Sequence, residues 1–315
     1  MSEHVLITHQ NIGDSFSGVY YIEQLHIRET TGGKDFTELI LRDKSGSRSV
    51  KYWGVVGGLA KGDWGFVSAR VEEYMGGPSI IAKNLEKEDA PSDLSAYVPV
   101  SEDHDKNLEK FSKLIEELRK LCSEVGDNTP LIIVESIFTD KFRAQFCDAP
   151  GGYGFYGCKG GALARTVRVG MSVRFLSGNY KLSPLDKAIA VASALLYSIG
   201  AAEVFHMKDC MPDEKTYGAL LGVEGYTNSR LLSVFRKLVK GGEADKDSGM
   251  RVLHAVASAR ETAVKAMTKE GIILSMANRM DEEVSNALNF IDDDINEEED
   301  FTAFDPKSKR RYLKV

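Results

Sequence analysis

The first hundred residues alternate between apolar and polar positions in short runs. In the clearest run, residues 35–43, every second position belongs to one face made of Thr37, Leu39 and Leu41. Alternation with a period of two is typical of a half-buried β-strand. Runs rich in β-branched and aromatic residues predict further strands at 18–30, 48–53, 65–73 and 79–84. Five short strands with glycine-bearing turns predict a small closed barrel.

Beyond residue 92 the apolar period lengthens to three or four residues. Leu108 begins such a stripe, which continues to Leu121 and predicts a helix with one packing face. Ser183 and Pro184, with Asp186 in the first turn, are typical of a helix start. The following residues, 188–199, are apolar almost all round and predict a buried helix. Further helices are expected at 231–239, 250–267 and 272–288.

The end of the chain carries blocks of like charge. Residues 292–300 hold seven acids in nine positions, and residues 307–314 hold five bases in eight. Such blocks repel themselves and favour disorder. We therefore expect an α+β chain with four parts. These are a five-stranded barrel at 1–98, a helical linker at 99–148, an all-helical domain at 149–288 and a flexible charged tail at 289–315.

Composition excludes several classes of protein. With 43% hydrophobic and 28% charged residues in 315, the chain is expected to form about two globular domains. A net charge of −7 excludes a histone-like wrap, and the lack of about 18 consecutive apolar residues excludes a membrane span. The N-terminus does not resemble a signal peptide. The four cysteines form no C-x-x-C pair, which favours a cytoplasmic protein without structural zinc.

Three motifs in the barrel region resemble OB-folds of the single-strand-binding kind. They are an L-x-D-x-S-G turn at residues 41–46, a strand ending in Trp53-Gly54, and Tyr74 beside Gly76-Gly77. The resemblance implies that Trp53 and Tyr74 stack on bases, an interaction worth about 1–3 kcal/mol per base whatever the sequence. The basic residues on these strands and turns are placed to follow phosphates. The candidate nucleic-acid-binding residues are Trp53, Tyr74, Lys51, Arg42, Arg48, Lys34 and Phe36.

Two observations oppose this interpretation. A tryptophan at a strand end, such as Trp53, also occurs as ordinary barrel packing. Residues 1–98 moreover carry ten Lys or Arg against fourteen Asp or Glu. Phosphate neutralisation supplies much of the affinity in nonspecific binding. A local basic groove is therefore required, or else stacking has to dominate.

The helical region resembles the YhaM-type 3′–5′ exonucleases, which join an OB-fold to an HD-type phosphohydrolase domain. The matching pieces are Ala149-Pro150, residues 160–166, 194–200, 217–222 and 253–258, and Asn278-Arg279-Met280-Asp281. An HD site needs imidazoles and carboxylates that converge on divalent metal. The positions that the resemblance assigns to the site residues, most of them metal ligands, instead read Phe155, Tyr156, Arg165, Tyr197, Ser198, Ala201, Val223, Ala259, Arg260 and Asn278. We expect no metal, no cofactor and no catalytic residue.

Two of these replacements are arginines. Arg165 and Arg260 would repel a cation, but a guanidinium suits a phosphate because its donors form a fork. The former site is therefore expected either to hold a phosphate of a strand or to pack as a structural core. The sequence leaves both uses open.

Together these features predict a non-catalytic single-stranded DNA-binding protein of replication, recombination or repair, with RNA as an alternative ligand. The acidic part of the tail resembles the tails by which bacterial single-strand-binding proteins recruit replication partners, although this tail ends in a basic block. The expected setting is the cytoplasm of a bacterium or of a phage-infected host. The alternatives are a divergent metal-dependent 3′–5′ exonuclease and a protein-interaction module of a replication complex.

Overall fold

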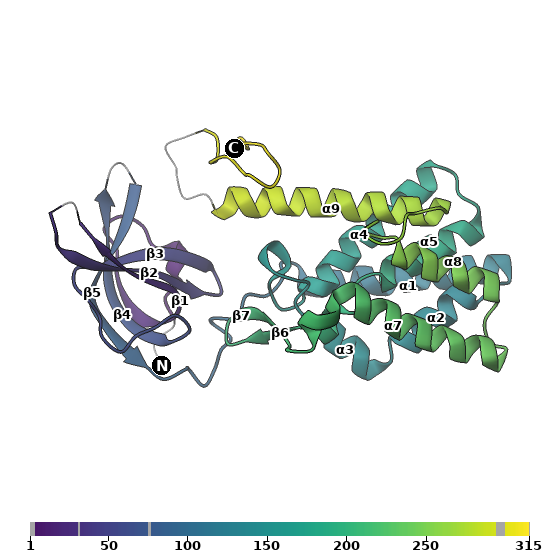
Figure 1. Cartoon of the computed structure of the whole chain (residues 1–315), viewed down its shortest axis with the longest axis horizontal. Helices are drawn as coiled ribbons and strands as arrows, with labels where there is room; N and C mark the ends of the chain where they lie inside the picture. The colour runs from purple at the N-terminus through teal and green to yellow at the C-terminus, as the bar shows by residue number, and fades with distance from the viewer. Residues whose placement is uncertain (1–3, 31, 75–76, 294–299, 315) are drawn as a thin grey trace. The chain divides into compact units, whose positions relative to one another are not determined.

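The computed structural model describes residues 4–30, 32–74, 77–293 and 300–314. The chain forms two compact units (Figure 1). The barrel unit comprises residues 1–99, the short segment Asp209–Met211 and residues 294–315. The helical unit comprises Val100–Lys208 and Pro212–Asp293. The predicted α+β class is confirmed.

The barrel consists of five strands, as predicted. They are β1 (Ser15–Glu29), β2 (Asp35–Asp43), β3 (Gly46–Tyr52), β4 (Trp64–Tyr74) and β5 (Gly77–Glu88), preceded by a short helix η1 (Ile7–His9). The strands close in the order β1-β2-β3-β5-β4. Only the β3–β5 pair is parallel, and the other pairs are antiparallel. This is the five-stranded closed arrangement of an OB-fold.

Alternation along β2 and β3 fills the barrel. Leu39 lies opposite Val50 in the antiparallel register, and both side chains are fully buried. Thr37 is on the same face, and its hydroxyl donates a hydrogen bond of 2.8 Å to the carbonyl of Gly54. The predicted division of β2 into an inner and an outer face is therefore confirmed.

Asp43 explains the L-x-D-x-S-G turn. Its buried carboxylate accepts hydrogen bonds from the backbone N–H of Ile7 at 2.7 Å and of Ser45 at 2.8 Å. His4 contacts the same carboxylate at 3.1 Å. Burial opposes ionisation of Asp43, but the hydrogen bonds from His4, Ser45 and Ile7 outweigh it and hold the pKa below its usual value. The motif thus ties the chain start and the β2–β3 turn to the barrel.

Within the described residues, the helical unit contains nine α-helices, one 3₁₀ helix and most of a small hairpin, whose turn belongs to the segment Asp209–Met211 of the barrel unit. The α-helices are α1 (His104–Val125), α2 (Thr129–Ile137), α3 (Asp140–Asp148), α4 (Gly161–Asn179), α5 (Pro184–Leu196), α6 (Ala201–Val204), α7 (Gly218–Gly241), α8 (Lys246–Ala257) and α9 (Lys269–Asp293). The 3₁₀ helix is η2 (Gly154–Tyr156), and the unpredicted hairpin pairs β6 (Phe205–Lys208) with β7 (Met211–Glu214).

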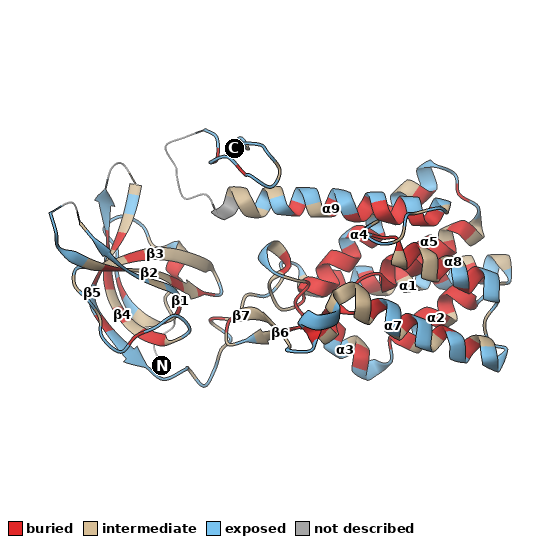
Figure 2. Ribbon diagram, viewed as in Figure 1, coloured by how far each residue is buried: buried red, intermediate tan, exposed pale blue. Residues whose placement is uncertain are grey.

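The core of this unit is centred on α5, where every side chain from Ala188 to Leu196 is buried (Figure 2). The segment Pro184–Val204 is long and apolar enough to cross a membrane, yet 89% of its most apolar window is buried inside the protein. The segment comprises α5, the turn after it and α6, and it packs in the core of the helical unit. The predicted start is also present, since the Ser183 hydroxyl accepts a hydrogen bond from the N–H of Asp186.

Two predicted boundaries are wrong. Residues 99–148 are not a linker, because Phe111, Leu114 and Phe146 are buried in the same core as α5. The tail does not begin at 289, because α9 continues to Asp293. Residues 300–314 form a turn closed by the bridges Phe301–Leu313 and Asp305–Arg310. The rest of the acidic block, 294–299, lies outside the described residues.

Candidate nucleic-acid interface

The residues of β2 and β3 that alternate with the buried ones form the outer surface of these strands. Glu38 lies directly opposite Lys51, and Lys51 is in turn paired with Ile81 on β5. Ile81 lies opposite Arg70 on β4. Side chains in register on one face of a sheet are neighbours. Lys51 and Arg70 therefore belong to one row that crosses the outside of the barrel.

Two aromatic side chains stand at the end of β2 and β3. Trp53 follows β3 directly and is 61% exposed. Its ring centroid is 5.6 Å from that of Phe36, with the rings tilted by 48°. Gly54 then takes a positive φ of 144°, and its carbonyl is held by Thr37. This turn directs Trp53 away from the barrel core, so the tryptophan is not a packing residue.

A third ring lies at the end of β4. Tyr74 is 61% exposed, and the Nζ atom of Lys51 is 5.1 Å from its ring centroid. A cation at this distance from a ring face is attracted by the ring quadrupole. Phe36, Lys51, Trp53 and Tyr74 are called the aromatic face below. They bring three rings and one cation together from β2, β3 and the end of β4.

The structure does not bring every predicted residue to this face. Arg42 points outward, but its Nε donates to Glu23 at 2.9 Å. Arg48 lies opposite Leu41 and is half-buried, on the other side of β3 from Lys51. Lys34 is exposed in the turn between β1 and β2. Of the four predicted cations, Lys51 therefore belongs to the aromatic face, and Lys34 is exposed in the turn that precedes β2.

Arg70 was missed by the sequence interpretation. It is exposed, and among the described residues it forms no ion pair. The signal was present, because Val67, Ala69 and Val71 of β4 are buried and place the intervening positions outside. The same alternation that identified the strand could have identified this cation.

Arg165 of α4 is enclosed in the helical unit and is 8% exposed. Its Nη2 donates to Asn278 at 3.2 Å and to Glu282 at 2.5 Å, and its Nε is 3.9 Å from Asp281. Asp281 also accepts a hydrogen bond of 2.6 Å from the hydroxyl of Tyr156. The arginine is thus already surrounded by oxygen acceptors from α9.

Arg260 approaches the same carboxylate. Its Nη2 is 3.4 Å from Glu282, and its Nε is 3.5 Å from Glu224. The adjoining cavity, lined in part by Tyr197, Ser198 and Arg260, has a volume of about 10 Å³. A water molecule needs about 10–15 Å³. A phosphate group would have to break these ion pairs, because both arginines are already paired with carboxylates of the chain itself.

The residues around Arg165 do not fit a divalent cation. Within the part of the chain that the structure describes, no three His, Cys, Asp or Glu side chains converge to hold a metal. Asn278, Asp281 and Glu282 instead contact a guanidinium. Burial raises the pKa of Asp281, although Tyr156 and Arg165 act in the opposite direction. The positive charge among these three side chains is the guanidinium of Arg165.

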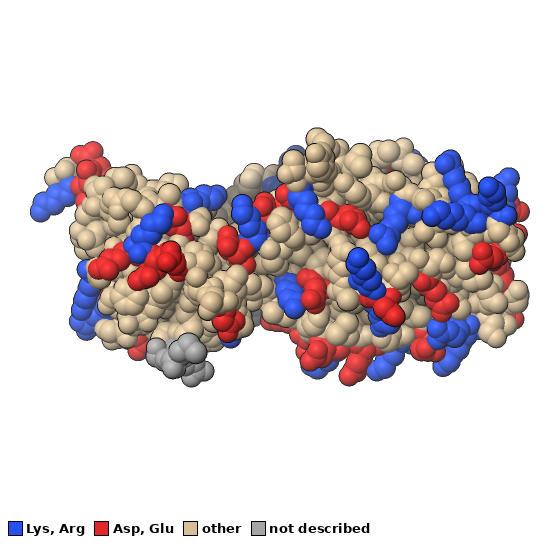
Figure 3. All heavy atoms as spheres, turned by 90° about the horizontal axis from the view of Figure 1, so that it is seen from below, with Lys and Arg blue, Asp and Glu red and all other residues tan. Residues whose placement is uncertain are grey.

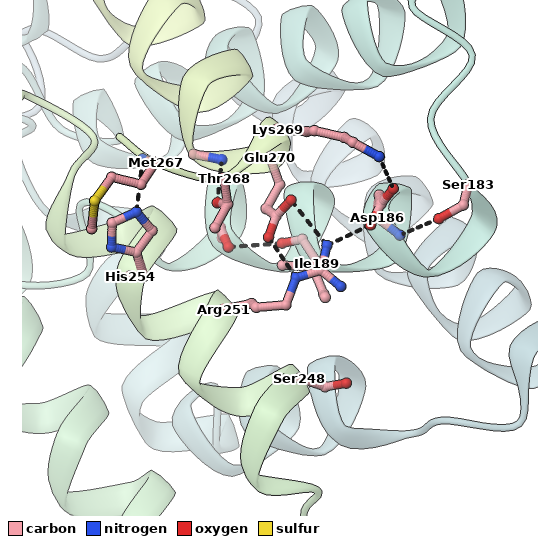
Figure 4. A network of polar contacts seen from close by, with 12 residues as sticks. Ser183, Asp186, Ile189, Ser248, Arg251, His254, Met267, Thr268, Lys269 and Glu270 are labelled. Atoms are coloured by element: carbon pink, nitrogen blue, oxygen red, sulfur yellow. Dashed lines mark hydrogen bonds and ion pairs between the residues drawn. The ribbon is translucent and has the colours of Figure 1, made fainter. Parts of the chain in front are cut away.

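A second charge network joins α5, α8 and α9 (Figure 4). Arg251 donates to both oxygens of Glu270, at 2.8 and 3.1 Å, and also to Asp186. Lys269 is 3.5 Å from Asp186. Both carboxylates, Asp186 and Glu270, are buried and paired, so this network ties the three helices together.

Parts of the chain are similar to solved structures. No protein-family model and no curated protein sequence matches the chain. Among solved structures, it is similar to the second OB-fold domain of replication protein A from Methanococcus maripaludis (19% identity, 28% of this chain and 98% of that chain, TM-score 0.24). It is also similar to the OB domain of Ta0387 from Thermoplasma acidophilum (19% identity, 32% and 94%, TM-score 0.23). A third is an aspartyl-tRNA synthetase from Leishmania major (10% identity, 37% and 31%, TM-score 0.20).

Proposed function

We propose that the barrel unit binds single-stranded nucleic acid, with DNA of replication, recombination or repair as the preferred ligand. The observation that carries this proposal is the aromatic face, where Trp53 and Tyr74 each expose 61% of their surface beside Phe36 and Lys51. Every base offers a flat π-surface, so exposed rings give affinity without sequence preference.

Charge supports stacking as the main source of affinity. Two cations of β1 and β2 are neutralised, since Arg42 is bound to Glu23 and Arg28 to Glu38. Basic and acidic side chains are also intermingled on the surface drawn in Figure 3. Lys34, Lys51 and Arg70 form no ion pair among the described residues and are available for phosphates. Binding is therefore expected to depend only moderately on salt.

For the helical unit we propose descent from a YhaM-type exonuclease whose metal centre is lost. The support is the contact of Arg165 with Asn278, since both stand at positions where the resemblance assigns metal ligands. Arg165 also contacts Asp281 and Glu282. A guanidinium there repels a divalent cation. The protein then acts without cutting the strand, in the cytoplasm of a bacterium or a phage-infected host, with the C-terminal tail as a site for replication partners.

The binding proposal is tested by fluorescence anisotropy of a labelled thymidine oligonucleotide. The wild-type chain is compared with a Trp53→Ala/Tyr74→Ala variant and with Ile12→Ala, an exposed apolar residue of the barrel unit outside the strands. Loss of binding in the double variant and not in Ile12→Ala supports the proposal. Equal binding by all three proteins rejects it.

The absence of catalysis needs a separate measurement. The wild-type chain is incubated with manganese and a 5′-labelled single strand, and the products are separated by length. An unshortened strand supports the proposal. Progressive shortening from the 3′ end would establish the alternative, a divergent exonuclease.

A further inference from the structure

One stretch of the helical unit differs in charge from the rest of the chain. The 37 residues from Ala149 to Leu185 contain five Lys or Arg and no Asp or Glu. The whole chain has 47 acidic residues in 315 and a net charge of −7. The same stretch contains five Tyr or Phe. A basic, aromatic segment in an acidic protein marks a surface suited to an anionic ligand with flat rings.

The structure shows which of these residues reach the surface. Arg165 is buried, and Arg174 donates to Glu117 at 2.8 Å, so neither is available. Arg168 and Lys181 are exposed, and in the described chain neither forms an ion pair. The guanidinium of Arg168 lies over the ring of Phe155, 4.7 Å from its centroid.

The exposed rings accompany these two cations along α4. Phe175 is 66% exposed and lies seven residues from Arg168, which places the two on the same side of the helix, about 10 Å apart. Tyr180, at the C-terminal end of α4, is 72% exposed beside Lys181. In the loop before α4, Tyr153 is 58% exposed. An exposed ring and a cation without an ion pair thus lie together at two places on α4: Arg168 beside Phe155 and Phe175, and Lys181 beside Tyr180.

We propose that this surface, called the α4 surface and made of Tyr153, Phe155, Arg168, Phe175, Tyr180 and Lys181, is a second binding site for single-stranded nucleic acid. The inference rests on the proposed function, since it assigns the same ligand class to the helical unit. The combination repeats that of the aromatic face, where Lys51 lies over Tyr74. Phosphates supply the missing counter-charge for Arg168 and Lys181, and bases cover the rings.

The test uses the full chain in a Trp53→Ala/Tyr74→Ala background, so that the barrel contributes little. A thymidine oligonucleotide containing 4-thiothymidine is bound, irradiated and mapped by mass spectrometry, and its affinity is measured by anisotropy at low salt. We expect crosslinks in residues 153–181. Adding Arg168→Ala and Phe175→Ala is expected to weaken the residual affinity by more than about tenfold.

The matched controls remove an exposed cation or an exposed ring from the helical unit outside the α4 surface. Lys120→Ala removes an exposed cation of α1, and Tyr217→Ala removes a ring that is 74% exposed. Both are expected to leave the residual affinity unchanged. Arg168→Lys with Phe175→Tyr keeps charge and ring, so retained affinity in this variant shows that loss in the alanine variant is not misfolding.

The outcomes separate the two proposals. Crosslinks confined to the barrel in the wild-type chain, with no effect of the α4 substitutions, overturn the second site and leave the barrel proposal intact. Full wild-type affinity in the Trp53→Ala/Tyr74→Ala background, lost on adding the α4 substitutions, overturns the barrel proposal and supports the α4 surface. Unchanged affinity in both sets rejects both.

Discussion

The barrel unit and the helical unit differ in whether their candidate binding side chains are exposed or buried. In the barrel unit, Trp53 and Tyr74 lie at strand ends, are exposed and do not pack in the barrel core. The centre of the helical unit instead encloses Arg165 among Asn278, Asp281 and Glu282. An exposed ring can contact a ligand, whereas a buried charge that is already paired within the protein contributes to folding. The comparison teaches that a charged residue at a position where a sequence resemblance assigns a site residue is not evidence for a working site.

The largest expected effect comes from removing the charge at the centre of the helical unit. Arg165→Met leaves the buried carboxylate of Asp281 without its nearby cation, whereas Glu282, whose side chain is 38% exposed, keeps Arg260. A buried charge left without its partner costs about 3–5 kcal/mol. Urea unfolding should show this loss. Arg279→Ala, which removes an exposed pair with Glu283 on the same helix, should cost less than about 0.5 kcal/mol. Comparable losses in both variants would contradict the assignment of Arg165 to the core.

Next in size is the loss of the barrel rings. Trp53→Ala/Tyr74→Ala should weaken oligonucleotide binding by about 2 kcal/mol per ring, or roughly a thousandfold together. Because both side chains are exposed, the midpoint of unfolding should stay close to that of the wild-type chain. A large loss of stability without loss of binding would reverse the contrast between the two units.

A smaller effect concerns the pH dependence of the barrel. The hydrogen bonds to Asp43 hold its pKa below the value near 4 that it has in the unfolded chain. Its contribution is therefore complete above that value and is lost as pH falls through the lower, folded-state pKa. Asp43→Asn should destabilise the barrel by about 1–3 kcal/mol at neutral pH and flatten the decline in acid. Urea unfolding at neutral and acidic pH measures both.

The smallest effect tests the charge of the aromatic face. If Lys34, Lys51 and Arg70 contact phosphates, the logarithm of the binding constant should fall with the logarithm of salt concentration with a slope of about −2. Lys51→Ala should reduce that slope by about 0.7. Arg42→Ala should leave it nearly unchanged, because Arg42 is already neutralised by Glu23. A steep loss of slope in Arg42→Ala would show that this ion pair opens for the strand.

The parts predicted correctly from sequence depend on neighbouring residues. Period two placed Leu39 and Leu41 inside and Phe36 outside, and the turn motif around Asp43 has a local cause in the hydrogen bond from the Ser45 N–H. The errors depend on partners far along the chain. Nothing near Arg42 shows that Glu23 neutralises it, and nothing near Arg165 shows that residues more than a hundred positions away receive its hydrogen bonds.

The prediction that residues 99–148 form a linker was wrong for a related reason. A stripe such as Phe111, Leu114 and Leu118 shows that a helix has a packing face, but not what packs there. Only the tertiary contact of α1 with α5 shows that this helix belongs to the unit that follows. Arg48 was misassigned for a local reason, because alternation along β3 already places it on the side of the buried Val50 and not on that of Lys51.

The two tryptophans of the chain differ in a way that makes the protein its own spectroscopic probe. Trp64 is 5% exposed and lies edge-on to Tyr97, with ring centroids 4.9 Å apart, whereas Trp53 stands in solvent. A water-soluble quencher such as iodide therefore reaches one indole and not the other. Any ligand that covers the barrel face should abolish the quenchable fraction of the emission while the blue-shifted remainder stays constant, without a dye on either molecule.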